Sequence, residues 1–208
     1  MSSELFIMLA TPREPPEFWN QIARLHQHEI REGFLSTLTL EFLARLYAAV
    51  VRSDKGFLLA AVYSDTGNVA GFICGATDTG RVLRECTWRS GFRLVIPLLP
   101  HVFSRRTITR VLETLRYASG NGDSTNLPRA EILNFCVDGN QQGRGIGRRL
   151  FAGLTNEFKR RGIHRIKIVT GESQASAQKF YDSARASRVG DVQIHKGIKS
   201  VVFVYEST

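Results

Sequence analysis

The sequence has few cysteines and no long apolar run, and both absences narrow the class of protein. Its cysteines are Cys74, Cys86 and Cys136, and their spacing fits neither a metal site nor a C-x-x-C motif. We expect free, buried thiols, with no disulfide framework and no metal. No stretch approaches the roughly 20 apolar residues that a membrane-spanning helix needs, and the start of the chain lacks the basic and then apolar regions of a signal peptide. The sequence therefore predicts a cytoplasmic protein without a transmembrane segment.

The composition favours one folded unit with a basic surface. The chain has 208 residues, 43% of them hydrophobic, which is enough for one sizeable core and short for two ordinary domains. We predict a single domain over residues 1–208. The formal net charge of +9 raises the question of nucleic acid. No helix-turn-helix, aromatic RNA-binding pattern or metal finger is visible, so nucleic acid is not expected as a direct partner.

One stretch of the chain has the pattern of an anion site. Residues 131–138 are typical of a buried strand, and residues 139–145 of a glycine-rich turn. The apolar residues that follow have helical spacing up to Gly162, which ends the predicted helix. A helix start presents unpaired N–H groups and the positive end of the helix dipole, and glycine lets a ligand approach the backbone closely. This turn therefore suits a pyrophosphate.

The spacing around the turn indicates which phosphate ligand to expect. A dinucleotide fingerprint needs glycine where this chain has Arg148, and the Gly-Lys-Ser/Thr of a Walker A loop is absent. Gln142, Gly145 and Gly147 instead match the acyl-CoA signature Q/R-x-x-G-x-G/A. In this the segment resembles the GCN5-related N-acetyltransferase (GNAT) superfamily. The alternative is a glycine-rich turn before an ordinary helix.

A second motif strengthens the resemblance. Gln174-x-x-Ala177-x-x-Phe180-Tyr181 follows a short predicted strand and is similar to the family motif N-x-x-A-x-x-F-Y. Gln174 stands where asparagine is usual, and residues 184–187 replace the customary Gly-Phe. These departures concern the contacts with the adenosine part of CoA. The close resemblance is confined to residues 130–206.

The order of the predicted elements fits the fold that the resemblance implies. We expect strands at residues 5–10, 56–63, 69–75, 131–138, 165–170, 189–195 and 200–205, and helices near residues 18–25, 38–50, 146–158 and 174–181. The class is α+β, an α/β/α sandwich with a GNAT-like mixed, mostly antiparallel sheet flanked by helices. A helical insertion at about residues 81–128 separates the third strand from the fourth, with helical pieces at 94–100 and 108–115.

The resemblance also implies how acetyl-CoA would be held. The backbone N–H groups of the turn would bind its pyrophosphate, and the backbone of Phe135 and Val137 would pair with the pantetheine arm. Basic side chains near the turn would contact phosphates, with solvated residues on a helix as the alternative. The expected cofactor residues are Phe135, Cys136, Val137, Gln142, Gly143, Arg144, Gly145, Ile146, Gly147, Arg148, Gln174 and Lys179.

Two catalytic roles follow from the same resemblance. Tyr181 would protonate the thiolate leaving group, and the alternative is a tyrosine that packs beside Phe180 in the core. Glu131 lies in an Ala-Glu-Ile run similar to that of histone-type members, and it would take the proton of the acceptor amine. This role is most effective if a partly apolar pocket raises the pKa of the carboxyl. A strand-end glutamate that faces solvent is the alternative.

The resemblance also implies that the acceptor lies near the junction of the first two helices, and the basic insertion is a second region where it could bind. His28 and Glu29 lie at the junction, where a solvated helix end is the alternative, and Arg89 and Arg93 lie in the insertion. Residues 81–116 are rich in Arg and contain no Lys, and Arg makes bidentate contacts with phosphate or carboxylate. An anionic acceptor such as an amino sugar or a nucleotide sugar is therefore expected.

Three functions from different classes stay open. The leading one is acetyl-CoA-dependent transfer of an acetyl group to the primary amine of a small acceptor. The second is the same chemistry on a protein lysine or N-terminus. The third is a non-catalytic acyl-CoA-binding module, against which the presence of Tyr181 and Glu131 argues. The expected partners are acetyl-CoA and an amine acceptor, and the sequence is compatible with a homodimer.

Overall fold

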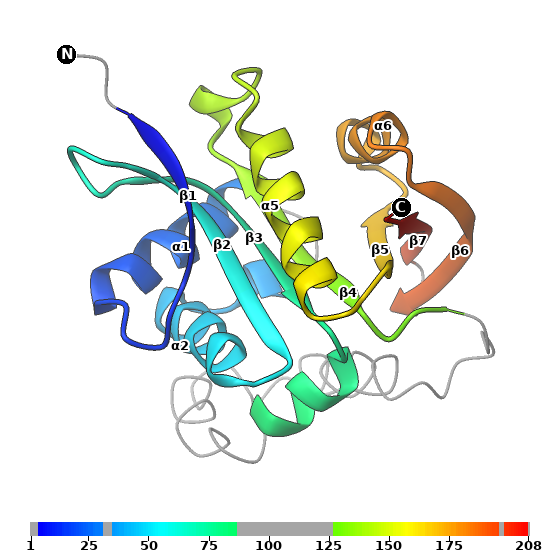
Figure 1. Cartoon of the computed structure of the whole chain (residues 1–208), viewed down its shortest axis with the longest axis horizontal. Coiled ribbons are helices and arrows are strands. Elements are labelled where there is room, and N and C mark those ends of the chain that lie inside the picture. Colours follow the sequence, from blue (N-terminus) through cyan, green and yellow to red (C-terminus); the bar gives the residue numbers. More distant parts are fainter. Residues whose placement is uncertain (1–3, 31–34, 87–126, 196–197, 208) are drawn as a thin grey trace.

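The computed structural model describes residues 4–30, 35–86, 127–195 and 198–207. These residues form a seven-stranded sheet in the order β1-β2-β3-β4-β5-β7-β6 (Figure 1). Neighbouring strands are antiparallel except β4 and β5, which are parallel. The strands are β1 (Leu5–Leu9), β2 (Gly56–Tyr63), β3 (Val69–Ala76), β4 (Glu131–Val137), β5 (Arg165–Gly171), β6 (Ser187–His195) and β7 (Ile198–Glu206).

Helices cover both faces of the sheet. The helices α1 (Pro16–Glu29) and α2 (Leu40–Arg52) lie on one face, and α5 (Ile146–Arg160) lies on the other (Figure 1). The shorter α6 (Ala175–Ser183) shares the apolar cluster of α5. Short 3-10 turns lie at Leu35–Thr37 and Gly139–Gln141. The predicted α+β class, with a mixed and mostly antiparallel sheet flanked by helices, is confirmed.

The central strands are apolar at successive positions because both of their faces are buried. In β2, Leu58 and Ala60 join the cluster under α1 and α2, whereas Phe57 and Leu59 join the cluster under α5. Successive side chains of a strand point to opposite faces, so a strand covered on both sides has no polar face. The sheet is thus the middle layer between two apolar cores.

The parallel pair β4 and β5 is where the sheet opens. The pairing of β4 with β5 consists of only two residue pairs, Glu131 with Lys167 and Ile132 with Ile168. Leu133 forms a bulge on the other edge of β4, because Ile132 pairs with Gly75 and Asn134 with Cys74. A bulge bends its strand and increases the twist. Beyond Ile132, therefore, β4 leaves β5, and the two strands form a fork that opens toward their carboxyl ends.

The predicted insertion lies between β3 and β4. Its first segment, residues 79–86, is helical, and Val82 and Cys86 of this segment are buried in the cluster under α1 and α2. The rest of the insertion, residues 87–126, lies outside the described residues, together with the predicted helical pieces at 94–100 and 108–115.

Two expectations from composition concern the cysteines and the membrane. Cys74 and Cys86 are buried, Cys136 is partly exposed, and all three are free thiols. Among the residues that the structure describes, no helix combines the length and the apolar character needed to cross a membrane.

A buried polar pair lies between α1 and α2. His26 is 1% exposed, and its Nδ1 lies 2.6 Å from the hydroxyl oxygen of Tyr47. Its Nε2 has no hydrogen-bond partner within the described part of the chain. Burial lowers the pKa of His26 from 6.5 to about 4, because the charged ring would lose its hydration. His26 is therefore neutral in the folded protein at pH 7.

This pair predicts a loss of stability at mildly acidic pH. The unfolded chain takes up the proton of His26 near pH 6.5, and the folded chain only near pH 4. The free energy of unfolding should therefore fall as the pH drops through this window, by about 1.4 kcal/mol per pH unit at most. Urea unfolding at pH 7, 6 and 5 measures this slope. The His26→Gln variant should show a smaller slope, whereas a change at the exposed His164 to Gln should leave it unaltered. An equal slope in all three proteins would contradict the assignment.

Candidate functional site

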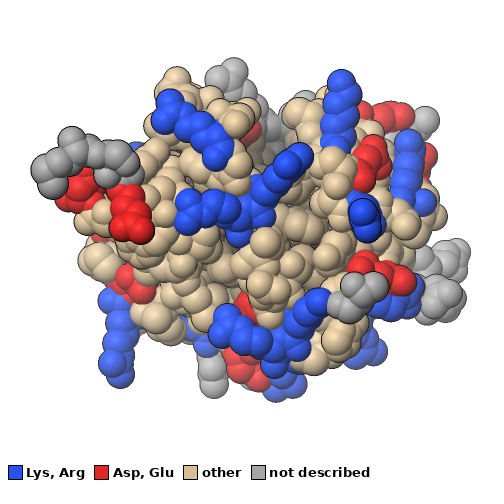
Figure 2. Space-filling view, turned by 45° about the horizontal axis from the view of Figure 1, so that its top comes forward, with Lys and Arg blue, Asp and Glu red and all other residues tan. Residues whose placement is uncertain are grey.

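The fork between β4 and β5 holds a cleft of about 880 Å³. Its walls are residues 132–137 of β4, residues 169–171 of β5, the glycine-rich turn with the first turn of α5, and one side of α6. Glu29 and Ile30 close it at the end of α1. From the end of the sheet at which α5 begins, the surface shows Lys and Arg side chains on both sides of a central hollow (Figure 2). The cleft is thus mixed in polarity and open to solvent.

The glycine-rich turn contains two glycines with a left-handed backbone. Gly143 and Gly145 have φ angles of 77° and 78°, a region that residues with a side chain rarely adopt. A Cβ atom added at either position would meet no atom within 4 Å. The space beside both glycines is therefore open to a ligand. Gly147 differs, because its Cβ would lie 3.4 Å from the ring of Phe135, and it lets α5 pack closely on β4.

The start of α5 presents a run of backbone donors. The first helical hydrogen bond joins the N–H of Arg149 to the carbonyl of Gly145, at 3.1 Å. In the described ranges, the N–H groups of residues 143–148 donate to no protein acceptor. These donors and the helix dipole together favour an anion such as a pyrophosphate.

The predicted basic residues differ in their positions relative to the cleft. Arg148 lines it. Arg144 and Lys179 are exposed and do not belong to its lining. Among the described residues, Arg148 is therefore the basic side chain best placed to meet a phosphate, and the phosphate contacts of Arg144 and Lys179 stay predictions.

Two glutamines of the predicted motifs make contacts within the protein. The side chain of Gln142 donates to the carbonyl of Val137 at 3.1 Å and so ties the turn to the end of β4. Gln174, the residue before α6, accepts from the hydroxyl of Thr170 at 2.7 Å. Both residues line the cleft. In this structure they hold the turn and α6 in place, and their direct contact with a ligand stays a prediction.

Tyr181 both packs in the core and lines the cleft. Its ring centre lies 5.6 Å from that of Phe180 and 5.9 Å from that of Phe203. The residue is 6% exposed, and burial raises the pKa of its phenol above the usual range. Its hydroxyl has no hydrogen bond to any residue that the structure describes. The phenol therefore keeps its proton and has it available to donate.

The end of α1 brings a carboxylate into the cleft. Glu29 is 14% exposed, and its Oε1 lies 2.8 Å from Nδ1 of His28. The same oxygen accepts from the N–H of Gly139 at 3.0 Å. Glu29 lines the cleft, whereas His28 has 72% of its side chain exposed and does not line it. The structure thus separates these neighbouring candidates, and Glu29 is the one that faces the site.

Glu131 lies at the closed end of the fork and is buried. Its Oε2 lies 3.1 Å from Nζ of Lys167 and accepts from the hydroxyl of Thr79 at 3.0 Å. Burial raises the pKa of Glu131, and the ion pair with Lys167 partly offsets this. Glu131 is not among the residues that line the cleft. Its role as the base stays a prediction, and it is not a solvent-facing strand end.

Other parts of the site were absent from the sequence-based prediction or lie outside the described residues. Asn134, Gln141 and Thr170 line the cleft, but no local pattern marks them. Asn134 of β4 and Thr170 of β5 border it where the two strands diverge, and Gln141 lies in the turn after β4. Arg89 and Arg93 lie outside the described residues. In the described part of the chain, no cluster of His, Cys, Asp or Glu side chains is suited to holding a metal ion.

Comparisons with known proteins agree with this architecture. The family model described as "Acetyltransferase (GNAT) family" matches residues 19–185. No curated protein matches the sequence significantly.

Solved structures share the fold at low sequence identity. An N-acetyltransferase from Staphylococcus aureus Mu50 has a TM-score of 0.61 and 13% identity over 98% of this chain and 99% of that chain. Arabidopsis thaliana NAA60 in complex with acetyl-CoA has a TM-score of 0.59 and 15% identity, over 98% of both chains. The ribosomal-protein-S18-alanine N-acetyltransferase from Escherichia coli has a TM-score of 0.56 and 12% identity over 97% and 94%. At these identities, the likeness shows the fold alone.

The geometry of the turn predicts that a side chain at position 145 blocks ligand binding. Coenzyme A carries the expected pyrophosphate, and at about 100 times its dissociation constant it should stabilise the wild type by about 2.7 kcal/mol. Gly145→Val should abolish this stabilisation, because the side chain fills the open space beside the turn. The measurement is the thermal unfolding midpoint with and without coenzyme A.

Gly162 provides a matched control for backbone strain. It ends the same helix with a φ of 74° and open space around its Cβ position. Gly162→Val should lose a similar stability, about 1–2 kcal/mol, and keep the response to coenzyme A. If coenzyme A stabilises both variants equally, the ligand does not bind at this turn.

Proposed function

This chain belongs to the acetyltransferase (GNAT) family, and we propose that it transfers the acetyl group of acetyl-CoA to the primary amine of a small acceptor. One observation carries the proposal: a single cleft joins a turn of unpaired backbone N–H groups to the protonated phenol of Tyr181. The turn suits the pyrophosphate of CoA, and the phenol suits the thiolate that leaves when the thioester is cleaved.

The chain would hold acetyl-CoA through its backbone. The N–H groups of residues 143–148 would receive the pyrophosphate, with Arg148 beside them. Beyond Ile132, the edge of β4 that faces β5 has no partner strand among the described residues. Its backbone groups on that side are therefore available to the amide groups of the pantetheine arm, as in the addition of a strand to a sheet. Acetyl-CoA supplies the activated acyl group.

Tyr181 would donate a proton to the leaving sulfur. Its raised pKa keeps the phenol protonated at neutral pH, and the rings of Phe180 and Phe203 fix its orientation. Proton transfer by a positioned acid stabilises the developing thiolate. This retained acid argues against a non-catalytic acyl-CoA-binding module.

Glu29 is the carboxylate that the described cleft offers to the acceptor. Its Oε1 already accepts from the N–H of Gly139 and lies 2.8 Å from Nδ1 of His28, which keeps the carboxylate fixed at the end of α1. A fixed, largely buried negative charge attracts an ammonium group, and the same carboxylate lines the cleft, where it could take up a proton. We therefore infer that Glu29 contacts the amine of the acceptor.

We propose that the acceptor that carries this amine is an amino sugar or a nucleotide sugar. It is supported by the Arg-rich, Lys-free segment 81–116, which includes Arg89 and Arg93. A protein lysine or N-terminus is the alternative acceptor, and a cytoplasmic location and a homodimer also stay proposals.

The function is tested by CoA release from acetyl-CoA with a panel of amines. Amino sugars, nucleotide amino sugars, polyamines and amino acids represent small acceptors, and peptides with a free N-terminus or a lysine represent proteins. Turnover with a small amine is expected. Turnover with peptides alone would establish the alternative, and acetyl-CoA binding without any turnover would indicate a binding module.

The proposed acid gives a specific prediction. Tyr181→Phe removes the hydroxyl and keeps the packed ring, so kcat should fall by about 10²- to 10⁴-fold while acetyl-CoA affinity is retained. Steady-state kinetics and calorimetric titration measure the two quantities. Tyr205 is a matched control, because its ring lies 5.2 Å from Phe151, which Tyr181 also contacts at 6.3 Å, and it does not line the cleft. An equal loss in Tyr205→Phe would remove the acid role from Tyr181.

A further inference from the structure

Three polar side chains meet at the closed end of the fork. Glu131 and Lys167 are register partners in β4 and β5, and their side chains are only 9% and 11% exposed. The third, Thr79, donates to the same carboxylate oxygen of Glu131 that lies 3.1 Å from Lys167. We call these three residues the fork cluster.

The fork cluster lies in the short stretch where β4 and β5 pair, next to the point where they part. The parallel pairing of β4 with β5 consists of two residue pairs, and the strands diverge immediately beyond it. Ile132, Ile166 and Ile168 belong to the apolar core under α5. Since side chains alternate along a strand, Glu131 and Lys167 occupy the opposite face of the sheet. The ion pair thus clamps the face of the fork that α5 does not cover.

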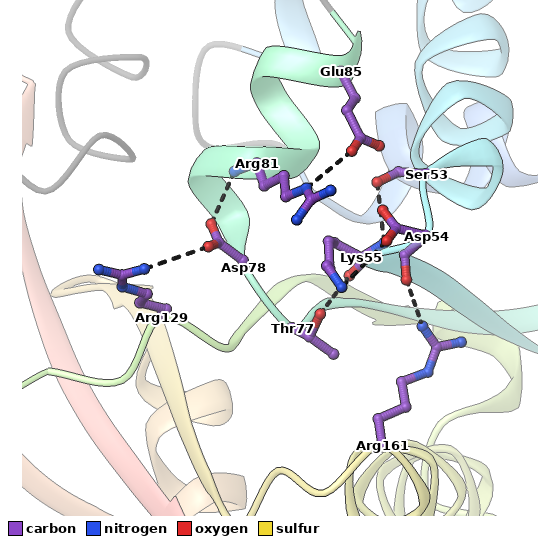
Figure 3. Close-up of polar contacts among 9 residues, drawn as sticks. All are labelled: Ser53, Asp54, Lys55, Thr77, Asp78, Arg81, Glu85, Arg129 and Arg161. Carbon is purple, nitrogen blue, oxygen red and sulfur yellow. Dashed lines mark hydrogen bonds and ion pairs between the residues drawn. The ribbon is translucent and has the colours of Figure 1, made fainter.

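Thr79 connects this clamp to the neck of the insertion. Its N–H and its hydroxyl both lie within hydrogen-bond distance of the carbonyl of Arg129, at 3.3 and 3.4 Å. The neighbouring Asp78 accepts from the N–H of Arg81 at 2.9 Å, and its other oxygen lies 3.9 Å from the guanidinium of Arg129 (Figure 3). The two ends of the insertion are therefore held together directly beside Glu131.

The surrounding contacts fix this neck to the body of the protein. The hydroxyl of Thr77 donates to the carbonyl of Lys55, at the turn between α2 and β2 (Figure 3). Arg161, at the end of α5, donates to the carbonyl of Asp54 in the same turn. The neck therefore has a fixed position relative to both faces of the sheet.

We propose that Thr79, Glu131 and Lys167 are positioning residues, which set the separation of β4 and β5 and so the width of the cleft, and that Glu131 acts through Lys167 and not as the base. Its carboxylate is occupied by two partners and does not line the cleft. The catalytic part of this inference rests on the proposed acetyl transfer.

The effect of adding one substitution to another distinguishes a positioning role from base catalysis. Lys167→Met leaves a buried carboxylate without its cation, which is strongly unfavourable, whereas an apolar pair of similar volume is often tolerated. Adding Glu131→Leu to Lys167→Met should therefore recover about tenfold or more of the lost kcat/KM. If Glu131 is the base, the same addition should lower kcat/KM further, by about 10²- to 10⁴-fold, and remove the acidic limb of its pH profile.

Acetyl-CoA affinity gives a second readout that does not depend on turnover. Lys167→Met and Thr79→Val should each weaken acetyl-CoA binding in calorimetric titrations. The variant that combines Glu131→Leu with Lys167→Met should restore this binding. Unaltered affinity and KM in both single variants, with reduced stability alone, would overturn the positioning role. If the Leu and Met pair does not fold, Glu131→Gln with Lys167→Gln tests the same reversal with polar side chains.

A surface ion pair on the same strand is the matched control. Arg165 of β5 and Glu206 of β7 are also register partners, 2.9 Å apart, but are 53% and 67% exposed. Arg165→Gln should alter neither acetyl-CoA affinity nor kcat/KM measurably.

If the wild type binds acetyl-CoA and acetylates no amine of the panel, the proposed function fails, while the affinity measurements still decide the role of the fork cluster.

Discussion

The short parallel pairing between β4 and β5 is the constraint on which the site depends. The backbone groups of a strand need partners, and here the ladder stops after two residue pairs, so the facing edges of both strands are left for another occupant. The bulge at Leu133 helps to turn β4 away from β5. The glycine-rich turn then follows β4, and α6 follows β5, so both functional motifs border the same opening.

The site combines groups whose local roles are structural. Tyr181 belongs to the core under α5 and also lines the cleft. Gly147 allows close packing of α5 on β4, whereas Gly143 and Gly145 leave space for a ligand. Because a rigid core holds each group, little reorganisation is needed when a substrate binds, which is the basis of electrostatic preorganisation.

Glu131 illustrates the difference between a sequence pattern and an environment. The run Ala-Glu-Ile places a carboxylate at the start of the central strand, as the resemblance implied. Its surroundings depend on Lys167, which is 36 positions later, and on Thr79, which lies 52 positions earlier across the insertion. Sequence spacing carries no information on such contacts, because strand register and the position of the neck create them.

The sequence by itself determined the local features: the continuous apolar character of the buried central strands, the glycine-rich turn before α5, and the place of Tyr181 in its motif. These depend on neighbours a few residues apart, so periodicity and backbone preference suffice. Only the tertiary structure decided that Glu29 and not His28 faces the cleft, that Arg148 and not Arg144 lines it, and that Glu131 is paired with Lys167. Each of these outcomes depends on how distant elements pack around the fork, and that packing has no period in the sequence.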